Sequence, residues 1–219
     1  SRPGREKCAF FCISSDQDST FDFLSSLFFS FLFIKLVRYA DAEGVDGKLP
    51  IGVNFVLDEF PNLGVINDFK KKISTVRSRN IGISVIFQNI AQLKNRYPND
   101  EYLEILGNCD TQIALGCTDE VTARFISNRT GEVTIDVNSQ SKQLYAMRMT
   151  DYTPEYRETN SVGRRKLMTA DEVLRMPLDE ALIILRGQNV FKVKKFDYTR
   201  HPESRKLKKC KAAAYIPDW

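Results

Sequence analysis

The sequence predicts an α/β protein built on a doubly wound, mainly parallel sheet. Over roughly the first 130 of its 219 residues, short apolar segments alternate with helical patterns, which is typical of strands joined by crossover helices. The apolar segments are continuous rather than alternating, as expected for strands covered on both faces. Hydrophobic residues make up 42% and charged residues 27% of the chain. This ordinary globular composition excludes disorder over most of the length.

The N-terminal segment predicts a strand and a long helix. Cys8–Ile13 (CAFFCI) is a short apolar run that suits a buried strand. The acids and hydroxyls that follow can cap a helix from about Thr20 to Ala42. Its apolar run, Phe23–Val37, contains Lys35, and at about 15 residues it is shorter than the ~20 that cross a bilayer. We therefore expect a buried core helix.

Three further strands and their helices follow in the same alternation. The strands are expected at Gly52–Leu57, Gly82–Phe87 and Cys109–Leu115. The helices are expected at Ile66–Arg79, Ile90–Arg96, Glu101–Leu106 and Thr118–Arg129, the last with Thr118 as its N-cap.

The pattern changes after residue 130. Residues 131–165 read as an alternating strand or hairpin with a polar loop, and Thr169 with Glu172 forms a capping box for a short helix. Glu180–Arg186 and Asn189–Lys194 flank Gly187 and predict a small C-terminal β-hairpin. We expect residues 1–203 to form one domain, with 131–168 as an irregular or hairpin insertion and 204–219 as a basic tail.

Charge and cysteine content narrow the function classes only slightly. The net charge is +4, but Lys192–Lys211 is strongly basic. Such a run is either a solvated tail or a contact for DNA backbone or anionic lipid. Five cysteines and a single histidine, His201, offer little for a zinc site, and they fit reduced thiols in a cytoplasmic protein.

An acid pair after an apolar strand is the sharpest chemical signal. In NFVLDEFPNLG (Asn54–Gly64) the strand ends at Asp58 and Glu59, which is typical of a Walker B motif. The first acid of such a motif holds Mg²⁺ through its water shell, and the second polarises the water that attacks the γ-phosphate. The alternative is that the two acids cap a turn.

Two weaker signals accompany it. Gln88 ends the next strand, where a polar side chain can sense the γ-phosphate, although a glutamine there can also be simply solvated. Arg77 and Arg79 lie at the end of the intervening helix. Either could act as an arginine finger on a neighbouring subunit or be a solvated helix terminus.

The ordered motifs LDEFPNLG, TVRSRNIGISVIFQN, QLKNRYP, GNCDTQIALGC and FISNRTGEVTI resemble the VirD4/TraG coupling proteins of type IV secretion and conjugation. DQDSTFDFLSSLFFSFLF and LMTADEVLRMPLDEALIILRG are similar to the Gram-positive conjugative-element branch of that family. The resemblance covers roughly residues 7–203. It implies a RecA-like P-loop NTPase fold in a homo-hexameric ATPase, membrane-anchored at the cytoplasmic face of the cell membrane. Such a protein passes DNA and relaxase substrates to the secretion channel proteins.

The resemblance also implies a role for each candidate residue. Asp58 is the acid associated with Mg²⁺, and Glu59 is the catalytic acid. Gln88 is the phosphate sensor. Arg77 is the expected arginine finger, with Arg79 as the second choice. ATP and Mg²⁺ are the implied cofactors.

One departure from the family pattern matters. No G-x-x-x-x-G-K-[ST] occurs in the sequence, so the Walker A strand and loop are missing, and the family's N-terminal transmembrane anchor is also missing. We therefore expect the C-terminal part of a nucleotide-binding domain, which by itself is soluble, cytoplasmic, inactive and without tightly bound ATP. The alternatives are a non-catalytic DNA- or relaxosome-binding module, and a related pilus-assembly or DNA-segregation motor.

Overall fold

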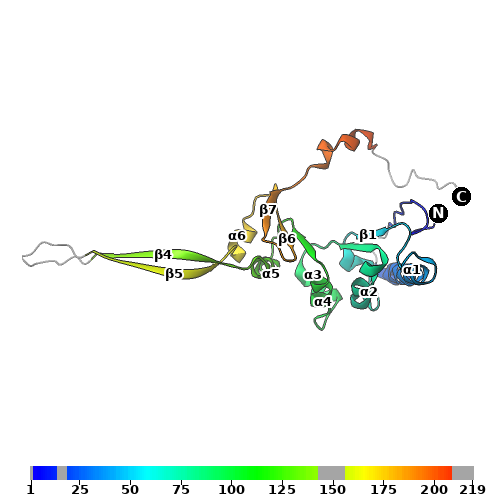
Figure 1. Cartoon of the computed structure of the whole chain (residues 1–219), viewed down its shortest axis with the longest axis horizontal. Coiled ribbons are helices and arrows are strands. Elements are labelled where there is room, and N and C mark those ends of the chain that lie inside the picture. The colour runs from blue at the N-terminus through cyan, green and yellow to red at the C-terminus, as the bar shows by residue number, and fades with distance from the viewer. Residues whose placement is uncertain (1, 14–18, 143–155, 209–219) are drawn as a thin grey trace, which may run out of the picture.

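The computed structural model describes residues 2–13, 19–142 and 156–208, and it shows an elongated row of helices and small sheets with one long hairpin projecting from an end (Figure 1). The strands are β1 (Val53–Leu57), β2 (Ile81–Val85), β3 (Thr111–Ala114), β4 (Glu132–Lys142), β5 (Tyr156–Lys166), β6 (Glu180–Leu185) and β7 (Phe191–Lys194). The α-helices are α1 (Asp22–Glu43), α2 (Phe69–Thr75), α3 (Ile90–Arg96), α4 (Glu101–Gly107), α5 (Glu120–Thr130) and α6 (Ala170–Leu174). Short 3-10 helices are η1 (Ser19–Phe21), η2 (Phe60–Leu63), η3 (Val76–Arg79), η4 (Tyr198–Arg200) and η5 (Pro202–Lys206).

The strands form three separate sheets. β1 and β2 are parallel, β3–β6–β7 is antiparallel, and β4–β5 is an antiparallel hairpin. The α/β class and the parallel pairing of β1 with β2 are confirmed. β3 bonds to β6 rather than to β2, and a groove of about 900 Å³ lies between β2 and β3. The expected single sheet is thus divided at this groove.

The predicted N-terminal strand is wrong. Residues Cys8–Ile13 make no ladder pairing, and their large side chains, including Phe11, are exposed. An apolar run becomes a strand only where a neighbouring edge supplies backbone partners, and this segment passes outside the three sheets.

Helix α1 has nearly the predicted bounds but is less covered than predicted. One face, with Phe29, Phe33, Leu36 and Ala40, is buried against the core, while only 17% of its most apolar window is buried. Among the described residues, Ser19–Glu43 is the one helical stretch long and apolar enough to cross a membrane, and core helices of soluble proteins and signal sequences can share that length and composition. The expectation of a buried core helix therefore holds for one face only.

Aromatic side chains dominate the main core. Phe33 packs on Phe55 with ring centroids 4.3 Å apart, and Phe60 lies 4.6 Å from Phe69. Tyr97 stacks on Phe60 at 5.2 Å with an interplanar angle of 4°. These contacts join α1, β1, η2, α2 and the end of α3 into one unit. A smaller second core lies under α5, α6 and β6.

The C-terminal elements largely follow the sequence signals. The capping box is confirmed: Thr169 Oγ1 accepts a bond from Glu172 N (3.3 Å), and Glu172 Oε2 accepts one from Thr169 N (2.9 Å). This backbone bond to the carboxylate lowers the pKa of Glu172. The β6–β7 hairpin is confirmed, with Gly187 at φ +75° in its turn. Helix α5 is capped by Asp119 instead of Thr118, since the Asp119 side chain accepts a bond from Thr122 N.

The insertion predicted at 131–168 as irregular or a hairpin forms a regular hairpin where the structure describes it. β4 and β5 pair along their full length, and the predicted polar loop at 143–155 lies outside the described residues. Of the predicted basic tail, 204–208 is described, and 204–206 belongs to η5. Lys211 and Cys210 lie outside the described residues.

Candidate functional site

The carboxyl edge of the β1–β2 pair gathers the predicted acids and the predicted sensor. The parallel register places Leu57 opposite Val85, so the residues that follow the two strands emerge at the same edge. Pairing continues past the strands, because Ile86 N donates to Leu57 O at 3.0 Å. Asp58, Glu59 and Gln88 therefore lie at one exposed edge of the sheet.

Glu59 adopts an unusual backbone conformation. Its φ of 46° and ψ of 46° lie in the left-handed region, which a non-glycine residue adopts at a cost of about 1–2 kcal/mol. Such strained residues cluster at functional sites. The Glu59 carboxylate accepts a bond from Asn62 Nδ2 at 2.9 Å, and Asp58 Oδ1 accepts one from Glu59 N at 3.1 Å. These short-range bonds hold both acids in a fixed turn.

A buried aromatic base supports this turn. Phe60, the residue after Glu59, is completely buried and stacks on Tyr97. The Tyr97 hydroxyl accepts a bond from Ile66 N at 3.2 Å, and burial raises the pKa of Tyr97 to about 12. Arg96 Nε donates to Pro61 O at 2.6 Å. The acids thus sit on a packed and hydrogen-bonded platform.

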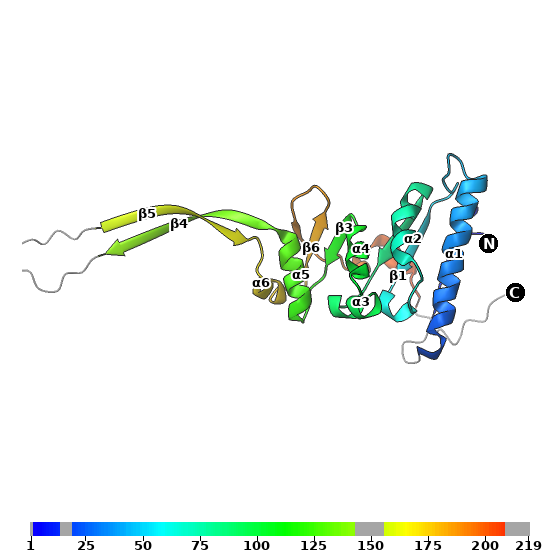
Figure 2. The same ribbon diagram turned by 90° about the horizontal axis from the view of Figure 1, so that it is seen from below.

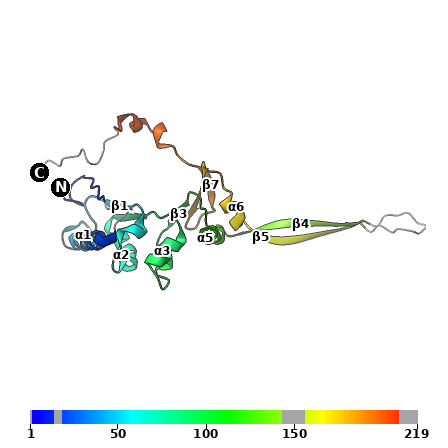
Figure 3. The same cartoon turned by 180° about the vertical axis from the view of Figure 1, so that it is seen from behind.

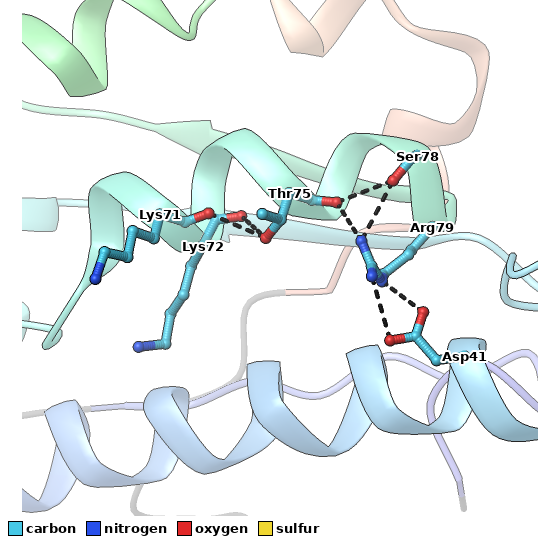
Figure 4. Close-up of polar contacts among 6 residues, drawn as sticks. All are labelled: Asp41, Lys71, Lys72, Thr75, Ser78 and Arg79. Carbon is cyan, nitrogen blue, oxygen red and sulfur yellow. Dashed lines mark hydrogen bonds and ion pairs between the residues drawn. The ribbon is translucent and has the colours of Figure 1, made fainter.

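The two candidate arginines lie at the opposite, amino edge. Helix η3 leads directly into β2, and Leu49 N donates to Arg79 O next to the start of β1. Figure 4 shows Arg79 reaching from η3 to Asp41 of α1. Its Nε and Nη2 donate to the two Asp41 oxygens at 2.8 and 3.2 Å, and Nη1 donates to Thr75 O at 2.9 Å. Arg79 therefore clamps η3 to α1.

Arg77 has a looser environment. Its side chain is 78% exposed and pairs with Asp110, which also receives Arg186 at 3.4 Å. The Arg79 side chain is 25% exposed by comparison. Of the two arginines, Arg77 is thus the one presented to solvent. Within this chain neither lies at the edge that carries Asp58 and Glu59.

The groove between β2 and β3 adjoins the acidic edge. Side chains and backbone of both strands line it, Gln88 among them. Its outer end toward α4 and β6 includes Arg77, Asp110 and Arg186. The groove therefore runs between the two edges of the sheet.

The acidic side chains at this edge can bind Mg²⁺ together with water and phosphate ligands. Among residues 2–13, 19–142 and 156–208, no group of three or more His, Cys, Asp or Glu side chains is arranged to hold a metal. Mg²⁺ commonly uses one carboxylate together with waters and substrate phosphates, so Asp58 fits that role. Cys109 and Cys117 are half-buried, and burial raises the pKa of both thiols, which disfavours reactive thiolates.

Three residues that contact the candidate side chains were not predicted from the sequence. Asn62 lies in the same FPNLG segment as the acids, so its short side chain in a turn was a usable signal. Asp41 and Asp110 approach Arg79 and Arg77 from 38 and 33 positions away. No local pattern could have predicted those two pairings.

Comparison with known proteins gives a consistent result. Residues 4–215 match the protein family described as "Type IV secretory system Conjugative DNA transfer". The chain is 32% identical over 149 residues to conjugal transfer protein TraG of Escherichia coli, covering 63% of this chain and 22% of that protein. It is 24% identical over 210 residues to protein VirD4 of Rhizobium rhizogenes, covering 96% of this chain and 30% of that protein. The chain thus spans less than a third of these relatives.

Solved structures of a conjugative coupling protein share the fold. Unbound TrwBΔN70 superposes with a TM-score of 0.61 at 15% identity, covering 80% of this chain and 36% of that one. TrwB bound to the ATP analogue ADPNP gives 0.60 at 16% identity, covering 83% and 38%. TrwB with ADP and Mg²⁺ gives 0.57 at 15% identity, covering 83% and 40%. At these identities the likeness shows the fold, a RecA-like P-loop NTPase.

Proposed function

The chain belongs to the type IV secretory system conjugative DNA-transfer family, and we propose that it is part of an ATP-hydrolysing coupling protein that delivers DNA and a relaxase to a type IV secretion channel. The observation that carries the proposal is the carboxyl edge of β1–β2, where Asp58, the strained Glu59 and Gln88 lie together. Ligands of open α/β sheets bind at this edge. The TrwB complexes with ADPNP and with ADP and Mg²⁺ support a nucleotide site in the family.

Each residue at the edge has a distinct role in the proposal. Asp58 would hold Mg²⁺ through its water shell, and Mg²⁺ would supply charge neutralisation for the phosphates. Glu59 orients and polarises the attacking water, with Asn62 fixing its carboxylate. Gln88, at the rim of the groove, contacts the γ-phosphate. Proton transfer to a positioned carboxylate contributes about 10²–10⁴-fold to such reactions.

The phosphate-binding loop has to come from outside this sequence, which holds no G-x-x-x-x-G-K-[ST]. The groove between β2 and β3 supports this part of the proposal. β2 is bonded to β1 and β3 to β6, so each strand turns an unpaired edge to the groove. A parallel strand seated there would join both sheets and place a glycine-rich loop beside Asp58. The chain alone then binds ATP weakly, and the Gram-positive assignment of the longer protein stays a prediction.

Arg77 is assigned as the arginine finger acting in trans. It lies at the amino edge, away from Asp58, and this position favours a nucleotide on another subunit as its target. Its exposed side chain and single acidic partner leave it available, whereas Arg79 is held by Asp41. A membrane-anchored homo-hexamer at the cytoplasmic face would supply that neighbour. DNA, the relaxase and the channel proteins are its proposed partners.

The test is ATP hydrolysis by the longer protein, unaltered and as Glu59→Gln. The variant should lose at least about 100-fold in turnover while it keeps nucleotide binding. Glu104→Gln, at an exposed glutamate of α4 in a surface ion pair with Lys70, is the matched control and should retain turnover. Unchanged turnover in Glu59→Gln would reject the catalytic role and favour a non-catalytic DNA- or relaxosome-binding module.

A further inference from the structure

Asp110 joins two exposed arginines at the outer end of the groove. Its Oδ2 accepts a bond from Arg77 Nη1, and Arg186 Nη1 lies 3.4 Å from its Oδ1. The Asp110 side chain is 37% exposed, whereas the side chains of Arg77 and Arg186 are 78% and 81% exposed. One carboxylate is therefore the base from which two guanidinium groups project into solvent.

Asp110 is itself held by the β3–β6 ladder. Arg186 N donates to Asp110 O at 3.0 Å, next to the pair that Thr111 forms with Leu185. Figure 2 shows β3 between β1 and β6, and Figure 3 shows it between β1 and β7. Asp110 immediately precedes β3, whereas Arg77 lies in η3 before β2, and both line the groove between these strands. Asp110 thus reaches Arg77 from the opposite wall of the groove.

The contact with Arg77 differs in kind from the one that fixes Arg79. Arg79 donates from Nε and Nη2 to the two oxygens of Asp41, and such a two-donor pair has a defined orientation. Arg77 gives Asp110 one nitrogen, and its Nε and Nη2 have no hydrogen-bond partner in the described part of the chain. The second Asp110 oxygen is taken by Arg186. Arg77 is therefore held at one end, with its remaining donors open.

The stability of the fold does not account for this arrangement. Ion pairs between exposed side chains contribute little to the free energy of unfolding, and both arginines are largely exposed. An arginine side chain that is free in solvent populates many rotamers, and ordering it during the reaction costs entropy. A contact that restricts these rotamers in advance lowers that cost. What the Asp110 contact supplies is therefore orientation.

We propose that Asp110 is a positioning residue, which holds the Arg77 guanidinium by one donor so that the remaining donors face a phosphate on the neighbouring subunit. The role assigned to Asp110 rests on the proposed action of Arg77 in trans and adds the group that orients this finger. Arg186 keeps the Asp110 carboxylate in place and prevents Arg77 from binding both of its oxygens. Arg77 touches the nucleotide, and Asp110 acts through Arg77.

The first test is ATP hydrolysis by the longer protein with Asp110→Asn, which keeps the size of the side chain and removes its charge. The value of kcat should fall by about 10- to 100-fold, since misplacing a reacting group by about 1 Å can cost that much. The KM for ATP should stay unchanged, because a finger acts on the transition state. Asp110→Glu, which restores a carboxylate, should recover part of the lost turnover. Asp179→Asn, at an exposed acid 3.3 Å from Lys194 Nζ, is the matched control and should retain full turnover.

Mixed assemblies show whether Asp110 acts through Arg77. Glu59→Gln carries an intact finger and a defective hydrolytic site, and Arg77→Ala carries the reverse. Mixed together, these two variants should hydrolyse ATP well above either one alone, and Asp110→Asn mixed with Glu59→Gln should do the same. Asp110→Asn mixed with Arg77→Ala should gain nothing, because both lack an effective finger. Circular dichroism checks folding, and Asp110→Ser replaces Asp110→Asn if that variant is misfolded.

The outcomes distinguish the role of Asp110 from the role of the finger. If Glu59→Gln complements Arg77→Ala but not Asp110→Asn, the finger stands and the positioning role of Asp110 is overturned. Turnover of Asp110→Asn equal to or higher than that of the unaltered protein also overturns it, and the higher value would show that Asp110 withholds Arg77 from the nucleotide. If Arg77→Ala keeps full turnover, or is not complemented by Glu59→Gln, the finger in trans is rejected together with the role of Asp110, while the catalytic role of Glu59 can still stand.

Discussion

The two edges of the β1–β2 pair differ in how they use their charged residues. At the amino edge, Arg79 is bonded to Asp41, and Arg77 is paired with Asp110. At the carboxyl edge, Asp58 and Glu59 form no ion pair with any residue in the described part of the chain. Their partners are a neighbouring backbone N–H and Asn62. At the amino edge, Arg79 holds η3 to α1 and only Arg77 is exposed, whereas both acids at the carboxyl edge are free of ion pairs in the described part of the chain.

The difference extends to the backbone and the core. The carboxyl edge combines a left-handed glutamate with a fully buried phenylalanine immediately after it. A strained turn persists only where the surrounding packing holds it in that conformation. The aromatic platform under Glu59 is therefore part of what makes the carboxyl edge a candidate site, and the comparison can be tested at each residue.

The largest expected effect comes from removing the platform. Phe60→Ala should lower the free energy of unfolding by about 3–5 kcal/mol, because a buried aromatic side chain leaves a cavity. Val56→Ala, on exposed β1 surface, should change it by less than about 0.5 kcal/mol. Chemical denaturation of this chain measures both. Similar losses for the two variants would mean that the carboxyl edge has no special support.

The two arginines at the amino edge should contribute differently to the free energy of unfolding. Arg79→Ala should lower the free energy of unfolding by about 1–2 kcal/mol, since it breaks bonds to a carboxylate and to Thr75 O. Arg77→Ala should cost less than about 0.5 kcal/mol because its ion pair is exposed. A double-mutant cycle of Arg79→Ala with Asp41→Ala checks the clamp. Equal effects of the two arginines would contradict the division of roles.

The strain at Glu59 predicts a smaller effect of opposite sign. Glu59→Gly should raise the free energy of unfolding by about 1 kcal/mol, because glycine adopts the left-handed conformation freely. The same change at Glu104, inside α4, should lower it by about 1 kcal/mol. Denaturation of both variants makes the comparison. A destabilised Glu59→Gly would show that the turn holds no strain.

The smallest effect on stability at neutral pH is expected at Tyr97. Burial raises its pKa from 10.0 to about 12, so the folded state binds its proton more tightly than the unfolded state. The resulting stability is fully present below pH 10 and is lost as the pH rises from 10 to about 12. Tyr97→Phe should remove this late loss of stability. A titration by near-ultraviolet absorbance in which all tyrosines ionise together near pH 10 would contradict the buried hydroxyl.

Local signals predicted most of the fold correctly. Helix α3 has the predicted bounds, and the Thr169–Glu172 capping box forms as expected, because each depends on residues within one turn of helix. The acids and Gln88 were placed at one edge by the strand–helix alternation alone. These features need no information from distant parts of the chain.

Long-range partners could not be predicted. The pairing of Arg79 with Asp41 depends on how α1 packs on η3. The Cys8–Ile13 segment has the composition of a strand but lacks an edge to pair with. The apolar run of α1, too short to cross a bilayer, predicted a buried helix, whereas one face stays open. In each case the structure depends on which surfaces pack together, and the sequence of one segment does not contain that information.

The most direct test of the carboxyl edge is the binding of Mn²⁺ with ATP, in place of Mg²⁺, to the longer protein, followed by electron paramagnetic resonance. Asp58→Asn should weaken Mn²⁺–ATP binding at least about tenfold, a loss of about 1.4 kcal/mol, because the carboxylate associated with the ion's water shell is gone. Asp68→Asn, at an exposed aspartate whose left-handed backbone asparagine also tolerates, should leave binding unchanged. Equal Mn²⁺–ATP binding by the unaltered protein and Asp58→Asn would contradict the assignment of this edge as the nucleotide site.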